Sequence, residues 1–303
     1  MLLRWSDQED ITDWNPTATN QAGSLSLSEG TEIVQAIQAR QEVLVWTDSA
    51  MYGLQYLGAP LVWGATLLGS NITIASPNAA VYSNNIAYWM GTSKFYYYDG
   101  TVKTLPCSVR SYVFDDFNSD QAQQVICGSN EEFDEIWWFY CSSGVTRNDR
   151  YVVYNYVENI WYYGTLSRSA WIDSDLRDFP IAATFDGKLI NQEKGVDDNE
   201  TGTPAAITAS ITSSQFDLDD GDRFILLPLQ DSGSGYYSPA SVGGSDSAAV
   251  TRTATTPIEA FTGIVDTRVR GRQMSFKLES TAAGVTWKLG VPRLQMRPDG
   301  RRG

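Results

Sequence analysis

The chain has 303 residues, 42% of them hydrophobic and 12% aromatic, which is enough apolar material for a large folded core. Its formal charge of −14 argues against general nucleic-acid binding, because neutralising phosphates requires a surplus of Lys and Arg. The absence of His excludes histidine acid–base catalysis, Ser-His-Asp nucleophile systems and imidazole metal sites.

Short apolar and aromatic runs, each ended by Gly, Asp, Asn or Ser, recur over residues 41–189 and are typical of antiparallel hairpins. Asp-Gly pairs beginning at Asp99, Asp186 and Asp220 supply the positive φ that tight turns require. The predicted strand pairs are residues 43–47 with 52–57, 86–90 with 95–98, 136–140 with 151–156, and 181–185 with 188–190.

An aromatic residue in the first strand of each pair suggests a repeat. Trp46, Trp89, Trp137 and Phe185 follow one another at intervals of 43, 48 and 48 residues, a period typical of propeller blades. A large antiparallel sandwich is the alternative. We therefore expect an all-β fold. Residues 1–200 would form propeller-like repeats of antiparallel hairpins, whose blade set need not be complete, and residues 201–303 a smaller β-sandwich-like domain.

The C-terminal region has longer alternating segments, which predict strands at residues 206–216, 267–279 and 286–296. Gly and Ser dominate residues 230–250, which we expect to form an exposed loop or arm. Three arginines lie close together in the segment predicted as a strand and form a candidate assembly interface. The alternative is that they are ordinary charged residues on a solvated face of that strand. These are Arg268, Arg270 and Arg272.

The acidic and Cys residues provide no convincing site. Residues 217–222 are only loosely similar to a calcium loop, because Gly221 stands fifth rather than sixth, so a hairpin turn is favoured. The acidic residues 196–200 are interpreted as a solvated linker. We predict no catalytic residue, no metal and no other cofactor. The Cys residues match neither a zinc ribbon nor a disulfide framework and are expected to be buried thiols: Cys107, Cys127 and Cys141.

Adjacent aromatic residues form another pattern. Successive side chains of a strand point to opposite faces, so only one of each pair can enter the same core. The other is free to pack against a neighbouring blade, a partner subunit or, as the alternative, a sugar ring. Trp138 and Tyr163 are therefore candidate assembly-interface residues. The full set is Tyr96, Tyr97, Trp137, Trp138, Tyr162 and Tyr163.

Specific strings occur in a fixed order along nearly the whole chain. They are residues 4–7, 13–16, 44–48, 88–91, 95–100, 135–140, 150–156, 161–164, 268–274 and 297–302. In this order they resemble the tail nozzle or tail stabilisation (head-to-tail hub) proteins of short-tailed phages.

The resemblance implies a structural virion protein of the tail, made in the host cytoplasm and without a membrane anchor. Such proteins assemble with themselves into a ring, commonly a hexamer, that extends the DNA ejection channel below the portal and adaptor. Other expected partners are needle, spike or fibre proteins, with genomic DNA only as passing cargo. The alternative is a tail-associated carbohydrate-binding module or glycosidase with a propeller fold, marked by paired acids beside exposed aromatics.

The chain departs from the family pattern in two places. A long region usually precedes the segment at residues 4–7, and a strand pair usual after Gly221 is missing. A sheet that lost a hairpin would expose an edge. We therefore expect a break in a longer chain near Phe224 and Ile225.

Overall fold

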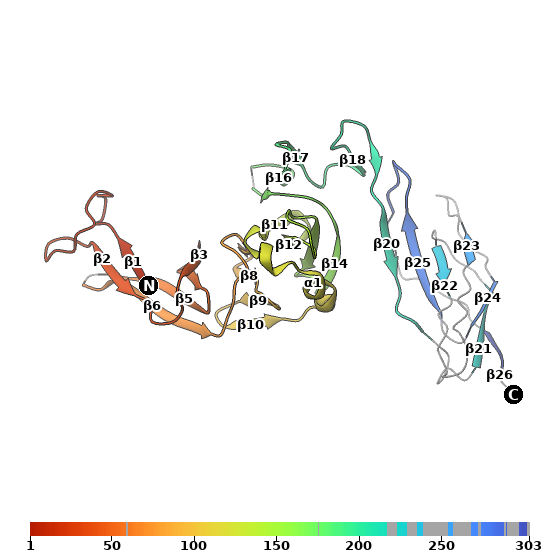
Figure 1. The fold of residues 1–303 in the computed structure, drawn as a ribbon, viewed down its shortest axis with the longest axis horizontal. Helices are drawn as coiled ribbons and strands as arrows, with labels where there is room; N and C mark the ends of the chain where they lie inside the picture. Colours follow the sequence, from red (N-terminus) through yellow and green to blue (C-terminus); the bar gives the residue numbers. More distant parts are fainter. Residues whose placement is uncertain are drawn as a thin grey trace. The chain divides into compact units, whose positions relative to one another are not determined.

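The structure is a computed structural model that describes residues 1–58, 60–174, 176–216, 223–228, 235–238, 254–256, 268–271, 274–287, 289 and 297–301. It divides into two compact units, Met1–Lys194 and Gly195–Gly303 (Figure 1). The division falls a few residues before the boundary that the sequence predicted, between residues 200 and 201. Each unit is described by itself.

The first unit is a series of antiparallel meanders, in which each strand pairs with its neighbour in the chain. The first sheet contains β3 (Ile33–Gln38), β4 (Val43–Thr47), β5 (Ala50–Gly58) and β6 (Val62–Ser70). The second contains β7 (Ala80–Ser83), β8 (Ile86–Met90), β9 (Phe95–Tyr98) and β10 (Val102–Leu105). The third contains β11 (Ile126–Asn130), β12 (Glu135–Tyr140), β13 (Arg150–Asn155) and β14 (Ile160–Thr165).

A shorter sheet and a hairpin flank these three. The fourth sheet has three strands, β15 (Ala170–Ile172), β16 (Ile181–Ala183) and β17 (Leu189–Asn191), and the hairpin is β1 (Leu2–Trp5) with β2 (Gly23–Ser26). The helical segments are short: α1 (Arg110–Asp116) and the 3-10 turns η1 (Ser119–Gln124) and η2 (Glu131–Phe133). Four-stranded meanders in series are the architecture of propeller blades, so the predicted all-β, propeller-like fold class is confirmed.

The four predicted hairpins are all present, as β4 with β5, β8 with β9, β12 with β13, and β16 with β17. The turns at Gly100 and Gly187 have φ of +109° and +85°, as the Asp-Gly pairs predicted. The third pair, at Asp220, lies outside the described residues. Phe185 was wrongly placed in a strand: β16 ends at Ala183, and Phe185 lies in the turn with Arg147 5.5 Å from its ring.

The first strands of successive sheets lie side by side: β3 beside β7, β7 beside β11, and β11 beside β15. A backbone hydrogen bond of 2.7 Å from Cys127 to Asn78 joins the second and third sheets at this point. Blades of a propeller are related in the same way around their axis. Within the described residues no comparable contact joins β15 back to β3, so the four sheets form a row with two ends.

One large core connects the first three sheets. Trp46, Trp89 and Trp138 are fully buried in it, each on the second strand of its sheet. Trp46 meets Trp89 edge to face at 5.3 Å between ring centroids. The sequence period used Trp137 as the third anchor, and this was wrong by one residue: Trp138 faces the shared core, whereas Trp137 lies in a separate cluster on the opposite face of β12.

The second unit has two antiparallel sheets and a short ladder. The ladder joins β18 (Asp197–Asp198) and β19 (Ala205–Ala206). One sheet has the order β20 (Ala209–Thr212), β25 (Ser275–Ser280), β22 (Gly235–Ser238) and β23 (Ala254–Thr256). The other has the order β24 (Arg268–Gly271), β21 (Arg223–Pro228) and β26 (Arg297–Arg301). Two sheets of this kind agree with the smaller sandwich-like domain expected from the sequence.

Three expectations for this unit require correction. The single strand expected over residues 267–279 is divided into β24 and β25, which belong to different sheets. Residues 230–250 were expected to form a loop, yet β22 lies within them, because its two adjacent Tyr residues favour a strand that pairs with β25. A break was expected near Phe224, yet β21 runs continuously through it, with a register shift against β26 between Arg223 and Ile225. The remainder of residues 230–250 and most of the predicted strand at residues 286–296 lie outside the described residues.

Candidate functional site

Trp138 lies in the core of the first unit rather than on its surface. Its indole Nε1 donates a 3.1 Å hydrogen bond to the Ala79 carbonyl oxygen, and its ring lies 4.9 Å from that of Phe95. Ala79 precedes β7 and Phe95 belongs to β9, so Trp138 joins the third sheet to the second. In this structure Trp138 presents no surface to a second chain.

Tyr163 on β14 is half-exposed and belongs to a cluster that the sequence did not reveal. Its ring stacks on Tyr112 of α1 at 3.8 Å between centroids. Arg150 donates a 3.1 Å hydrogen bond from Nη1 to the Tyr112 hydroxyl, and its Nε lies 3.7 Å from carboxylate oxygens of Asp116 and Asp149. The cluster therefore combines an aromatic surface with one arginine and two carboxylates, and aromatic residues and Arg are both enriched at protein interfaces.

The three predicted arginines are described only in part. Arg268 and Arg270 lie on β24, opposite Pro228 and Leu226 of β21. Arg272 lies outside the described residues.

The inner face of the fourth sheet packs against the third. Trp171 of β15 stacks on Trp137 with ring centroids 5.1 Å apart and planes inclined by 17°. Its Nε1 donates a 2.8 Å hydrogen bond to the Ser129 carbonyl oxygen of β11. Gly128 lies beneath the indole and leaves room for this close approach. β12 of the third sheet is therefore buried on both faces.

The outer face of the fourth sheet is apolar and uncovered. Ile172 is 61% exposed and Leu189 is 78% exposed, and Ile181 lies opposite Ile172 in the ladder between them. At the other end of the row the first sheet is covered, because Leu3 and Leu25 of the β1–β2 hairpin pack against its outer face. The uncovered face of β15–β17 is thus a surface on which a further sheet could pack, as the third sheet packs on the inner face.

A partly buried carboxyl group lies at the start of β12. Glu135 accepts a 3.0 Å hydrogen bond from Trp137 Nε1 and a short one from the Tyr162 hydroxyl. Burial raises the pKa of Glu135 above its usual range, and the nearby charge of Asp134 adds to the rise. Sequence reasoning missed this group, although Tyr162 was among the aromatics singled out.

A second carboxyl group faces the first from the loop after β17. Glu193 has a φ of +55°, which is uncommon for a residue with a side chain. Glu193 is an exposed residue, yet desolvation by the atoms around its carboxyl group raises its pKa, and repulsion from Glu135 and Glu132 raises it further. Two carboxyl groups with raised pKa beside aromatic rings are a recurrent pattern in acid–base sites, but buried structural pairs produce the same shifts.

The described residues contain no group of three or more His, Cys, Asp or Glu residues that could hold a metal ion. The Cys residues are free thiols. Cys141 is buried as predicted, whereas Cys107 and Cys127 are only partly so. Burial raises the pKa of Cys107 and of Cys141 to about 11, which leaves little reactive thiolate at neutral pH.

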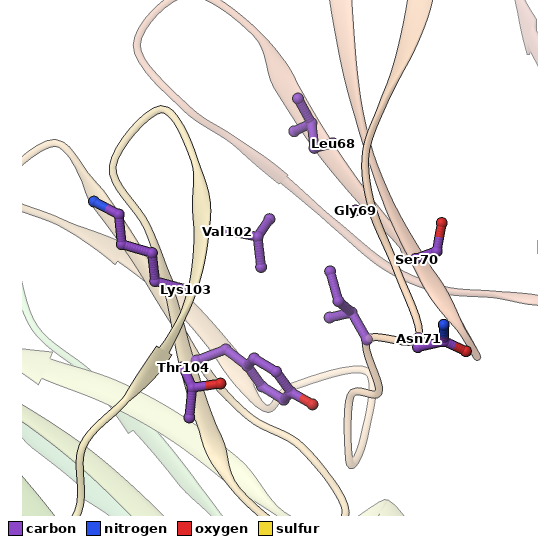
Figure 2. Close-up of a pocket in the computed structure, with 9 residues that line it drawn as sticks. Leu68, Gly69, Ser70, Asn71, Val102, Lys103 and Thr104 are labelled. Atoms are coloured by element: carbon purple, nitrogen blue, oxygen red, sulfur yellow. The ribbon is translucent and has the colours of Figure 1, made fainter.

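A pocket of about 270 Å³ lies between the outer edges of the first and second sheets (Figure 2). Figure 2 shows Val102, Lys103 and Thr104 of β10 on one side and Leu68 and Ser70 of β6 on the other. Its nine lining residues include no carboxylate, so the pocket offers no acid pair for hydrolysis.

Among the described residues no helix is long and apolar enough to cross a membrane.

No known family model matches the sequence, and neither does any curated protein. Among solved structures, one similar chain is an exo-β-1,3-galactanase from Phanerochaete chrysosporium, in a complex with β-1,3-galactotriose. The identity is 7%, over 82% of this chain and 93% of the galactanase chain. Its TM-score of 0.23 is too low for the likeness to support a fold or a function.

Proposed function

We propose that this protein is a structural subunit of a phage tail, of the nozzle or hub type, that assembles into a ring with copies of itself. One observation carries the proposal: the fourth sheet leaves an apolar face uncovered, although β12 of the third sheet in the same row is buried on both of its faces. The order of the sequence strings noted above supports the choice of family.

An uncovered apolar sheet face favours association. Contiguous exposed apolar surface is uncommon on soluble monomers and usually marks an interface. A contact between one end of the row and a different surface of the next copy is heterologous, and such a contact forms a ring when the rotation between successive copies closes. A ring of six copies with the acidic composition of this chain would repel DNA phosphates and let the genome pass without adhering.

Light scattering on the purified full-length protein tests the interface. Leu189→Glu places a charge in the uncovered face and is expected to weaken self-association at least about tenfold, since burying a charge in place of Leu costs well over 1.4 kcal/mol. Leu176→Glu is the matched control, because Leu176 is 94% exposed in a loop outside the sheet. A wild-type chain that remains monomeric at high concentration would contradict the proposal.

The place in the virion requires a separate test. Cryo-electron microscopy of intact particles is expected to locate this chain in a ring directly below the portal and adaptor. Density for a single copy, or density in a peripheral fibre, would contradict the nozzle assignment even if the protein forms rings alone.

A second candidate function, a tail-associated glycosidase or carbohydrate-binding module, is favoured by the raised pKa of Glu135 beside Tyr162. Release of reducing sugars from host-surface polysaccharide would support it if Glu135→Gln abolishes the release. Glu42→Gln is the control, because Glu42 also accepts a Tyr hydroxyl, from Tyr98 at 2.8 Å. Absence of release and of glycan binding leaves the structural role.

A further inference from the structure

The longest strands of the first unit extend beyond their sheet as a two-stranded ribbon. β4 pairs with β5 only as far as Leu54, opposite Val43. The last four residues of β5, from Gln55 to Gly58, pair with β6 alone. At about 3.3 Å per residue the ribbon therefore continues about 13 Å past the end of β4.

The end of this ribbon carries large apolar side chains that the protein leaves in water. We call Tyr56, Leu57, Leu61 and Trp63 the apolar tip. Tyr56 and Leu57 are more than half exposed, and Leu61 is 67% exposed. Trp63 packs edge to face on Tyr56 at 5.5 Å. Within the described residues, neither the Tyr56 hydroxyl nor the Trp63 indole N–H makes a hydrogen bond, so both polar ends remain available to a partner.

The backbone at the tip is strained, which marks it as more than an ordinary turn. Val62 has a φ of +57°, and a positive φ is a genuine outlier for a β-branched residue. Gly58 on the opposite strand has a φ of +79°. Strained backbone of this kind clusters at binding sites and switch regions.

Charge distinguishes the tip from the rest of the chain. Residues 49–93 contain no Asp, Glu, Lys or Arg, although 19% of the whole chain is charged. A charged group, Glu42, lies at the base of the ribbon, where its Oε2 accepts a 3.3 Å hydrogen bond from Gln55 Nε2. A lipid bilayer tolerates Leu in its outer hydrocarbon layer, favours Tyr and Trp at headgroup depth and excludes charge.

We propose that the apolar tip inserts shallowly into a zwitterionic lipid bilayer, with Leu57 and Leu61 below the headgroups and the polar ends of Tyr56 and Trp63 among them. Beyond Leu54 the ribbon has only two strands and therefore open edges, whose backbone groups hydrocarbon cannot satisfy, so the ribbon does not cross the bilayer. The net charge of −14 selects neutral over anionic lipid at low salt. This contact does not depend on the ring.

Flotation of the full-length protein with phosphatidylcholine vesicles tests the proposal. The wild type is expected to float with the vesicles, and Leu61→Asp is expected to lower the partition coefficient about tenfold or more. Leu176→Asp, the same change at another exposed loop Leu, is expected to float like the wild type. Phosphatidylglycerol vesicles are expected to bind less at low salt, with the difference shrinking as salt rises.

Quenching by brominated phosphatidylcholine supplies a readout that does not need Leu61→Asp to fold. Shallow bromine atoms are expected to quench the wild type more than Trp63→Phe. Equal flotation of Leu61→Asp and the wild type, or no flotation with either lipid, would overturn the proposal. A third outcome would also overturn it: the wild type does not bind vesicles, and Leu61→Asp changes the oligomeric mass. The tip would then contact protein rather than lipid.

Discussion

Gly128→Ala should separate the fourth sheet from the third. A Cβ added at Gly128 would overlap Trp171 Cδ1 and would lie 2.7 Å from Cγ of the same ring. Real Cβ atoms essentially never approach other atoms so closely. Because β11 is held in its ladder with β12, we expect Trp171 to move rather than the strand.

Displacing Trp171 removes three contributions to the free energy of unfolding. The hydrogen bond from Trp171 to the Ser129 carbonyl contributes about 1 kcal/mol. The stack on Trp137 contributes about 1 kcal/mol beyond its buried area. Returning a half-buried indole to water costs about 1 to 2 kcal/mol more. We therefore expect Gly128→Ala to destabilise the first unit by about 3 to 4 kcal/mol.

Urea unfolding monitored by Trp fluorescence would measure this cost, since nine of the ten Trp residues lie in the first unit. If displacement of Trp171 is the cause, Gly128→Ala will cost little in a Trp171→Ala background. Gly144→Ala is the control: its φ of +76° predicts a backbone cost of about 1 kcal/mol, and no atom crowds the added methyl. Equal costs of Gly128→Ala in both backgrounds would refute the reasoning.

Two further predictions concern pH and metals. The raised pKa of Glu135 means that its contribution to stability is fully present below its ordinary value of 4.5 and is lost as pH rises through the folded value. Urea unfolding at several pH values should therefore show a smaller loss of stability with rising pH in Glu135→Gln than in the wild type, and parallel curves would contradict this. A chelator should leave the unfolding midpoint unchanged, and stoichiometric zinc in elemental analysis would contradict the prediction of a metal-free fold.

The sequence predicted the hairpins well because their signal is local. Strands such as β8 and β9 are short aromatic runs separated by turn residues, and one turn of chain is enough to pair them. Which face a residue occupies depends on what covers the sheet, and this is not a local property. The choice between Trp137 and Trp138 was therefore decided by the neighbouring sheets, which bury both residues.

The candidate sites were harder to predict because their partners are distant in sequence. Tyr163 was identified from its adjacent aromatic, but its stacking partner Tyr112 lies on α1, a seven-residue helix without a clear amphipathic pattern. Glu135 and Glu193 come together only when the fourth sheet packs on the third. No spacing rule connects residues that are brought together by blade packing.

The distribution of apolar residues over the two faces of each strand indicates where a neighbour is required. β12 has aromatic residues on both faces, and each face is covered by an adjacent sheet. β15 shows the same character, with Trp171 directed toward the third sheet and Ile172 toward solvent. A strand with apolar residues on both faces is expected to be covered on both. The proposed self-association would cover the free end of the row for the same physical reason that the inner sheets cover one another.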